Sequence, residues 1–277
     1  MSFDPRLTLA RPDLAAIGLE GLVRADLFAE PRRMVVTTPA AALRKAPASD
    51  AEQWDQLLFG EAFDVLEEAG GFCWGQAARD GYVGFVDCAA LAPVGELATH
   101  RVCAIRTYAF SKPDIKSKPA GLYSLNALVA VEAREGRFAK AAGGGWFIEA
   151  HLAPLGEFDS DPAAVAERFI GAPYQWGGRE SLGLDCSGLI QQALYACGRS
   201  CPRDTDMQAA SLGEPITQDQ LRRGDLVFWK GHVVMMLDET RIIHANAHFM
   251  DVTIEPLADA LARIGAVYGA PTAFRRP

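Results

Sequence analysis

Hydrophobic and polar positions follow three successive patterns along the chain, and each pattern predicts a different kind of element. From Asp13 to Ala29 apolar residues recur at helical spacing behind Pro12, which predicts one amphipathic helix. From Met34 onward, short alternating segments are separated by glycine and Asp-Gly turns, which is typical of a small β-barrel. We therefore expect a helical segment over residues 1–33 and a first barrel over residues 34–95.

A second stretch with the barrel pattern covers residues 96–155. Both stretches open with a strand, turn at a charged hairpin and end in an aromatic strand, Tyr82–Phe85 in the first and Trp146–Ile148 in the second. This shared outline predicts two diverged copies of one small barrel.

An α+β pattern follows over residues 156–277. Asp161 and Pro162 suit the N-cap and first position of a helix, and a second helix is predicted over 186–197, between Asp185 as N-cap and Gly198 after its end. Strands are predicted over residues 225–230, 232–237, 241–245 and 252–255.

Composition and charge narrow the class of protein. The chain has 277 residues, 49% of them apolar, and a net charge of −8, so its surface repels nucleic-acid phosphates and anionic lipids. We expect no nucleic-acid or membrane partner, and the one basic stretch, Lys112–Lys118, suits a solvated loop.

The beginning of the chain lacks the apolar segment of a signal peptide, and no apolar run approaches the ~18 residues of a membrane helix. We therefore expect a cytoplasmic protein, and the six cysteines should be mostly reduced thiols.

The start of the predicted helix at 186 carries candidate chemistry. With Asp185 as N-cap, Cys186 lies in the first turn, where unpaired N–H groups and the helix dipole favour an anion. This position predicts a lowered thiol pKa and a nucleophile. The alternative is a buried structural thiol.

Two of the five histidines, His232 and His244, lie twelve residues apart on neighbouring predicted strands. A turn centred on Asp238 places them directly opposite each other, and one centred on Glu239 places them diagonally. Both arrangements put them on one sheet face, within about 5–8 Å; a two-residue turn would separate them. Such a pair could be a base with its orienting residue beside Cys186, or two metal ligands. We expect no metal or other cofactor, because no carboxylate or fourth ligand stands close by in the sequence.

Five short motifs follow one another in the last third of the chain. They are Pro-Tyr-Gln-Trp-Gly-Gly at 173–178, Asp-Cys-Ser-Gly at 185–188, Gly-Asp-Leu-Val-Phe at 224–228, Gly-His-Val at 231–233 and Ile-His-Ala at 243–245. In this order they resemble the NlpC-type cysteine peptidases, papain-like enzymes that cleave bacterial cell-wall peptides. The resemblance implies an α+β papain-like domain in which Cys186 is the nucleophile, His232 the base and His244 the residue that orients it.

The two barrels are similar to bacterial SH3-like domains. Two such barrels before the peptidase resemble the γ-D-glutamyl-L-diamino-acid endopeptidases of cell-wall peptide recycling. Phe85 is a departure, since the family often has Trp there.

This second resemblance implies further site residues. Glu61, Tyr82, Asp185 and Ser187 would bind the free amino group of a small murein peptide that begins with L-Ala. A buried carboxylate such as Asp185 needs a cation, which that amine would provide. In the mechanism that we expect for such a peptidase, the Tyr174 hydroxyl would be an oxyanion donor beside the Cys186 N–H.

The resulting expectation is a cysteine peptidase that cuts the γ-D-glutamyl–diamino-acid bond of such peptides. It leaves open whether the diamino acid is lysine or diaminopimelate. The alternatives are an amidase or acyltransferase of the same fold that acts on another amide, and a non-catalytic module that binds wall peptide.

Overall fold

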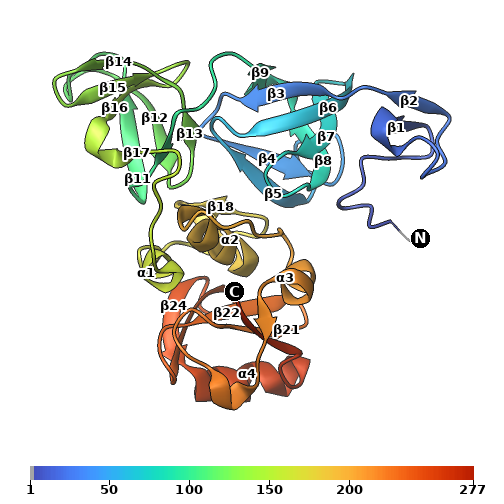
Figure 1. Cartoon of the computed structure of the whole chain (residues 1–277), viewed down its shortest axis with the longest axis vertical. Coiled ribbons are helices and arrows are strands. Elements are labelled where there is room, and N and C mark those ends of the chain that lie inside the picture. The colour runs from blue at the N-terminus through green and yellow to red at the C-terminus, as the bar shows by residue number, and fades with distance from the viewer. Residues whose placement is uncertain (1–2) are drawn as a thin grey trace. The chain divides into compact units, whose positions relative to one another are not determined.

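The computed structural model describes residues 3–277, and the chain divides into two compact units, Met1–Leu155 and Gly156–Pro277 (Figure 1). The division falls where the sequence predicted the start of the α+β domain. Within the described part of the chain, no helix has both the length and the apolar character needed to cross a bilayer.

The first unit begins with extended chain instead of the predicted amphipathic helix, so that prediction is wrong. Strands β1 (Leu14–Ala16) and β2 (Leu27–Ala29) pair in parallel around a single 3-10 turn, η1 (Ile17–Leu19). Gly21 has a φ of 78°, which an α-helix cannot contain. Two residues of the predicted segment, 1 and 2, lie outside the described residues.

A seven-stranded antiparallel sheet follows, in the order β5-β4-β8-β7-β6-β3-β9. Its strands are β3 (Arg32–Val36), β4 (Ala40–Arg44), β5 (Gln53–Leu58), β6 (Ala62–Ala69), β7 (Phe72–Ala77), β8 (Val83–Asp87) and, after the 3-10 turn η2 (Cys88–Ala90), β9 (Leu91–Pro93). Alternation sets the faces: in β6, Phe63 and Val65 are buried while Asp64 between them is partly exposed. Strands β5 and β9 form the edges, so a closed barrel stays a prediction.

The same strand order returns in the second half of this unit. The elements are β10 (His100–Val102), β11 (Arg106–Phe110), β12 (Pro119–Ser124), β13 (Leu128–Val129), β14 (Val131–Glu135), β15 (Phe138–Ala141), β16 (Gly145–Ile148), η3 (Glu149–His151) and β17 (Leu152–Pro154). They form sheets β12-β11-β16-β15-β14 and β13-β10-β17. With β13 and β14 together in the place of β6, the order matches the first sheet. Both halves also end in a 3-10 turn and a Leu-Ala-Pro strand, which supports the prediction of two copies.

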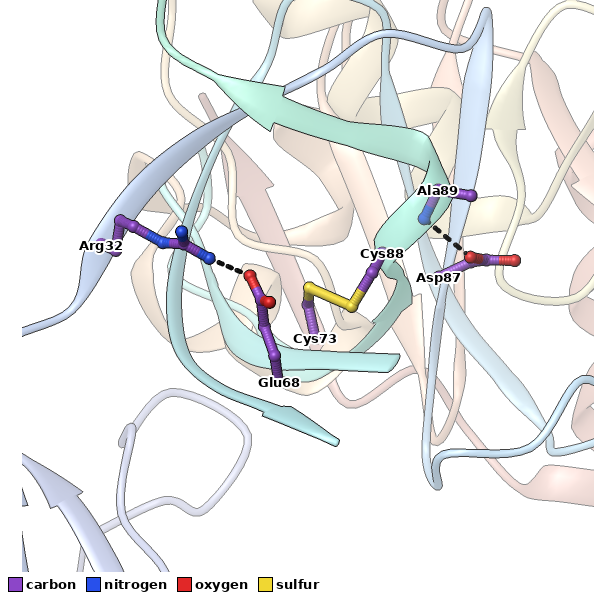
Figure 2. The surroundings of a disulfide bond; sticks show 6 residues. All are labelled: Arg32, Glu68, Cys73, Asp87, Cys88 and Ala89. Carbon is purple, nitrogen blue, oxygen red and sulfur yellow. Dashed lines mark hydrogen bonds and ion pairs between the residues drawn. A yellow bond between two sulfur atoms is a disulfide. The ribbon is translucent and has the colours of Figure 1, made fainter. Parts of the chain in front are cut away.

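A disulfide joins Cys73 in β7 to Cys88 just beyond β8, with the two Cα atoms 5.3 Å apart (Figure 2). The two strands are neighbours in the sheet. Figure 2 shows two further links near the bond: an ion pair between Arg32 and Glu68, and a hydrogen bond in which Ala89 N donates to Asp87. The expectation that the cysteines are reduced is therefore wrong for this pair.

The second unit surrounds a six-stranded antiparallel sheet of order β20-β25-β21-β22-β23-β24. The strands are β20 (Glu214–Pro215), β21 (Leu226–Trp229), β22 (His232–Met236), β23 (Arg241–Asn246), β24 (Asp251–Pro256) and β25 (Ala273–Arg276), with a separate pair β18 (Arg179–Glu180) and β19 (Gly183–Leu184). The helices are α1 (Pro162–Glu167), α2 (Cys186–Ala196), α3 (Thr205–Ser211) and α4 (Leu257–Tyr268), with a 3-10 turn η4 (Gln218–Gln220). In Figure 1, α2 and α4 lie on opposite sides of β21 and β22.

The helix caps that the sequence predicted for this unit are confirmed. The Asp161 side chain accepts a hydrogen bond from Ala163 N at 2.9 Å, and Asp185 caps α2. Gly198 follows the helix with a φ of 73°. All eleven residues of α2 are buried, so the helix has no solvent-exposed face. Helix α4 was not predicted; Leu257, Ala260 and Ile264 pack it against the sheet.

Candidate active site

Cys186 is the first residue of α2, and its side chain lies against the strand that begins with His232. The sulfur is 4.0 Å from the carbonyl oxygen of Gly231, and the backbone N–H of Val233 acts on its thiolate form. Cys186 is 6% exposed. The sulfur therefore lies beside the backbone on both sides of His232.

The two histidines form the pair that the sequence predicted. The ladder aligns Met235 with Ile243, which centres the turn on Glu239 and makes the histidines diagonal neighbours on one face. Nε2 of His232 is 2.8 Å from Nδ1 of His244. Because Nε2 is engaged, Nδ1 is the ring nitrogen of His232 that remains for Cys186.

A carboxylate that the sequence did not reveal completes the row. Oε1 of Glu255 in β24 lies 2.9 Å from Nε2 of His244, and the same oxygen contacts the Arg263 guanidinium from α4. Glu255 pairs with Ile242, so it shares a sheet face with His244. Strand parity could have revealed Glu255, but only after the register of β23 and β24 was known.

Burial decides the charge state of the nucleophile and the base. It lowers the pKa of His232 to about 3, and repulsion by a protonated His244 and by Arg263 would lower it further. It raises the pKa of Cys186 to about 12, helped by the negative charge of Asp185. The lowered thiol pKa expected from the helix start is therefore wrong, because desolvation outweighs the helix N-terminus. The resting pair of Cys186 and His232 is therefore neutral.

Asp185 is held by a buried arginine that the sequence analysis overlooked. Nη1 and Nη2 of Arg203 donate to its two carboxylate oxygens at 3.0 and 2.5 Å, and Gly177 N, Gly188 N and the Ser187 hydroxyl donate as well. Ser187 also accepts from Arg203 at 2.7 Å. Arg203 is therefore the cation that the buried Asp185 carboxylate needs, and the prediction that a substrate amine must fill this role is wrong.

A cavity of about 580 Å³ opens beside the base. His232 and Tyr174 line it together with Lys230, Arg263 and Trp176, and no Asp or Glu of the described residues does so. Burial raises the pKa of Tyr174, and the Cys186 thiolate raises it further. The phenol therefore stays protonated and can donate a hydrogen bond near the sulfur.

Residues 171–263 match the NlpC/P60 family. The matched segment contains Tyr174, Cys186, both histidines of the pair and Glu255. Residues 171–263 form an NlpC/P60 domain. A second match, to the bacterial dipeptidyl-peptidase SH3 domain, covers residues 43–91 of the first sheet, so one bacterial SH3 domain precedes the NlpC/P60 domain.

Named relatives match about a third of this chain. One is dipeptidyl-peptidase 6 of Lysinibacillus sphaericus, 35% identical over 36% of this chain and 37% of its own. Another is the γ-D-glutamyl-L-lysine dipeptidyl-peptidase of Bacillus subtilis strain 168, 33% identical over 34% of each chain. The match thus spans little more than a third of either relative.

A solved structure extends the likeness in fold beyond the NlpC/P60 domain. An NlpC/P60 family protein from Bacillus cereus ATCC 10987 superposes with a TM-score of 0.76 and covers 88% of this chain and 99% of that one, at 19% identity. This likeness concerns the fold alone.

Two predicted substrate residues lie in the SH3 domain. Glu61 is buried, accepts from Arg79 Nη1 at 2.8 Å and accepts from Leu58 N at 3.1 Å. Tyr82 is buried and packs edge-on against Trp54, with ring centroids 6.3 Å apart. Like Asp185, Glu61 already has an arginine partner. A role for either residue in substrate binding stays a prediction.

Proposed function

We propose that this chain is a cysteine peptidase that hydrolyses the γ-D-glutamyl–diamino-acid bond of small murein peptides with a free N-terminal L-Ala. The observation that carries the proposal is the row of Cys186, His232 and His244 on α2, β22 and β23. The names of the relatives support the substrate class, since a dipeptidyl-peptidase releases two residues from a free N-terminus.

The first half of the reaction forms an acyl-enzyme. Nδ1 of His232 takes the proton from the Cys186 sulfur, and the sulfur attacks the γ-carbonyl carbon of D-Glu. The tetrahedral oxyanion accepts hydrogen bonds from the Cys186 N–H and the Tyr174 hydroxyl; loss of one such donor typically costs about 3 kcal/mol. His232 then gives its proton to the leaving nitrogen, the C–N bond breaks and the diamino acid departs.

The second half returns the enzyme to its starting state. His232 takes a proton from water, and the hydroxide oxygen attacks the thioester carbon. The C–S bond breaks, L-Ala-D-Glu leaves with a free γ-carboxyl group, and His232 returns the proton to the sulfur. A base that is neutral at rest suits both halves, because each begins with proton uptake by His232.

The proposal includes a role in peptidoglycan recycling, which would place the protein in the cytoplasm with imported wall fragments. The Cys73–Cys88 disulfide points toward an oxidising compartment instead. Fractionation of the source cells, combined with thiol labelling without reductant, separates these locations. A cytoplasmic protein with both thiols reduced supports recycling, and an extracytoplasmic oxidised protein contradicts it.

The central experiment follows release of the diamino acid from L-Ala-γ-D-Glu-meso-diaminopimelate. Wild-type protein should release it, and Cys186→Ala should not, while its circular dichroism spectrum stays unchanged. Cleavage by Cys186→Ala would overturn the mechanism. A wild type that leaves this peptide and its lysine counterpart intact, yet hydrolyses a simple acyl ester, would favour an amidase or acyltransferase.

The requirement for a free N-terminus has its own test. N-acetylation of the L-Ala residue should remove most activity, because a dipeptidyl-peptidase recognises that amine. Cleavage of the acetylated peptide at the same rate would contradict this part of the proposal and leave the bond assignment standing.

A further inference from the structure

We propose that Glu255 is a positioning residue that fixes the direction of the protons along the His232–His244 pair. In this arrangement Nδ1 of His232 is unprotonated and is the ring nitrogen left for the Cys186 thiol. The assignment rests on the proposed function for the role of His232 as base, whereas the proton positions themselves follow from three neighbouring contacts.

A carboxylate accepts hydrogen bonds but cannot donate them. Glu255 Oε1 lies 2.9 Å from Nε2 of His244, and within residues 3–277 no other hydrogen-bond acceptor serves that nitrogen. The proton of a neutral His244 is therefore on Nε2. The N–H does not point directly at the carboxylate oxygen, so the contact is close but poorly aligned as a hydrogen bond. Catalytic contacts are often poorly aligned before substrate binds.

That choice sets the next one. With its proton on Nε2, His244 presents a bare Nδ1, which can only accept. Nε2 of His232 lies 2.8 Å from it and must carry the N–H that donates. A neutral His232 with its proton on Nε2 has a bare Nδ1, which is the lone pair that removes the thiol proton.

Arg263 keeps the Glu255 carboxylate ionised. Its guanidinium contacts the same oxygen of Glu255, and it works with His244 to lower the pKa of the carboxyl against the effect of burial. The other charged or titratable groups around the pair are Cys186 and the Asp185–Arg203 ion pair at the start of α2, and those that line the cavity with His232: Tyr174, Lys230, His248 and Tyr268. None of these can accept the His244 proton in place of Glu255, because Glu255 alone contacts Nε2 in the described structure.

Glutamine at this position separates a structural role from a positioning role. The amide of Glu255→Gln has the shape of the carboxylate but offers an acceptor and a donor, so it supports either tautomer of His244. The variant retains the packing around position 255 but no longer favours the tautomer of His244 with its proton on Nε2. The matched control is Glu167→Gln, which removes a carboxylate from a surface ion pair with Arg223 in the same unit.

The first measurement needs no substrate. In the full-length chain labelled with ¹⁵N-histidine, long-range ¹H–¹⁵N spectra report which ring nitrogens carry protons, and only five histidines must be assigned. We expect both His232 and His244 of the wild type to be protonated on Nε2. Glu255→Gln should give the other tautomer in part, and Glu167→Gln should match the wild type. A wild-type His232 protonated on Nδ1 overturns the proposal even if the variant fails to fold.

The second measurement is steady-state cleavage of the diaminopimelate peptide across pH. Glu255→Gln should lower kcat by at least about tenfold with KM within about twofold, since a misdirected base affects the reaction more than binding. The acidic limb should move to lower pH, because an anion behind the base has been lost. Arg263→Met should move that limb to higher pH, because a cation has been lost.

The outcomes are distinct. A fall in kcat with unchanged tautomers and an unchanged acidic limb assigns Glu255 a merely structural role and overturns the inference. Wild-type spectra with the expected tautomers, but no cleavage of any murein peptide, support the proton arrangement and overturn the proposed function.

Discussion

Asp185 combines three tasks in one buried side chain. It caps α2, ties the Tyr174–Gly178 segment to the helix through Gly177 N, and pairs with Arg203. With five donors on two oxygens, its acceptor positions are filled. Asp185 thereby fixes the start of α2, where Cys186 lies, and a role for Asp185 in substrate binding stays a prediction.

Removal of the guanidinium should therefore be costly. Arg203→Met leaves a buried carboxylate without its cation, and we expect the free energy of unfolding to fall by about 3–5 kcal/mol. Denaturant titration measures the change. Arg223→Met, which breaks exposed ion pairs to Asp161 and Glu167, should cost about 1 kcal/mol or less. Equal losses of unfolding free energy in the two variants would contradict a stabilising role for the buried Asp185–Arg203 ion pair.

The shifts at Cys186 and His232 predict a distinctive pH response. A thiol whose pKa is about 12 stays protonated at neutral pH, so iodoacetamide should alkylate Cys186 slowly at pH 7 and faster only above about pH 9. Peptide mapping by mass spectrometry follows the site. Rapid, pH-independent alkylation between pH 5 and 8 would show a thiolate–imidazolium pair at rest.

The same shifts set the sign of the stability change. The folded-state pKa of His232 is depressed from 6.5 to about 3, so the unfolded chain binds more protons between these values. The contribution of His232 to stability is fully present above pH 6.5 and is lost as the pH falls toward 3. His232→Gln should flatten this part of the stability profile, as measured by urea unfolding; an unchanged slope would contradict the burial of a neutral imidazole.

At the scale of elements, the pairing of neighbouring strands brings distant residues together in both units. It aligns the candidate catalytic side chains in the second unit and the two disulfide cysteines in the first. The β22–β23 hairpin brings the two histidines together, and the β23–β24 pairing adds Glu255. In the SH3 domain, β7 and β8 bring Cys73 and Cys88 close enough to cross-link. Both arrangements depend on register, because a one-residue slip would turn each side chain to the other face.

The disulfide should contribute measurably to the first unit. It closes a 15-residue separation, and a loop of that size corresponds to about 3 kcal/mol of stabilisation. Reductant should lower the unfolding midpoint of the SH3-containing unit, and Cys73→Ala/Cys88→Ala should reproduce the loss without reductant. Reductant with no effect on the wild type would contradict a formed bond.

At the scale of the whole molecule, charge is unevenly distributed. The chain carries a net charge of −8, yet the wall of the cavity beside His232 contains Lys230 and Arg263 and no Asp or Glu among the described residues. Glu255 engages Arg263, whereas Lys230 is exposed. The cavity therefore suits a substrate group with an added carboxylate better than one with only an ammonium group.

This charge predicts a preference between the two diamino acids. We expect a higher kcat/KM for the diaminopimelate peptide than for the lysine peptide, although one relative is named for L-lysine. Lys230→Met should reduce the ratio about fivefold, as one partly exposed ion pair of about 1 kcal/mol would. Lys116→Met in the exposed loop of the first unit is the control. Faster cleavage of the lysine peptide by the wild type would contradict this reading of the cavity.

The sequence by itself determined the features that depend on local spacing. Asp161 and Asp185 as caps, Gly198 after α2 and the even separation of His232 and His244 all act over a few residues, so their consequences could be derived before any fold was known. The NlpC-type motifs could be recognised for the same reason, because each is a contiguous stretch of a few residues.

Tertiary structure decided whatever depends on burial and on strands distant in the chain. Glu255 reaches His244 only through the register of β23 and β24, and Arg203 reaches Asp185 across 18 residues. The extent of burial reversed the expected shift in the pKa of Cys186, because desolvation depends on everything packed around the sulfur and not on its position in the helix. The prediction of an N-terminal helix was wrong for a related reason. The spacing of apolar residues describes only one face of an element. The parallel pairing of β1 with β2 and the positive φ of Gly21 depend on contacts that this spacing does not contain.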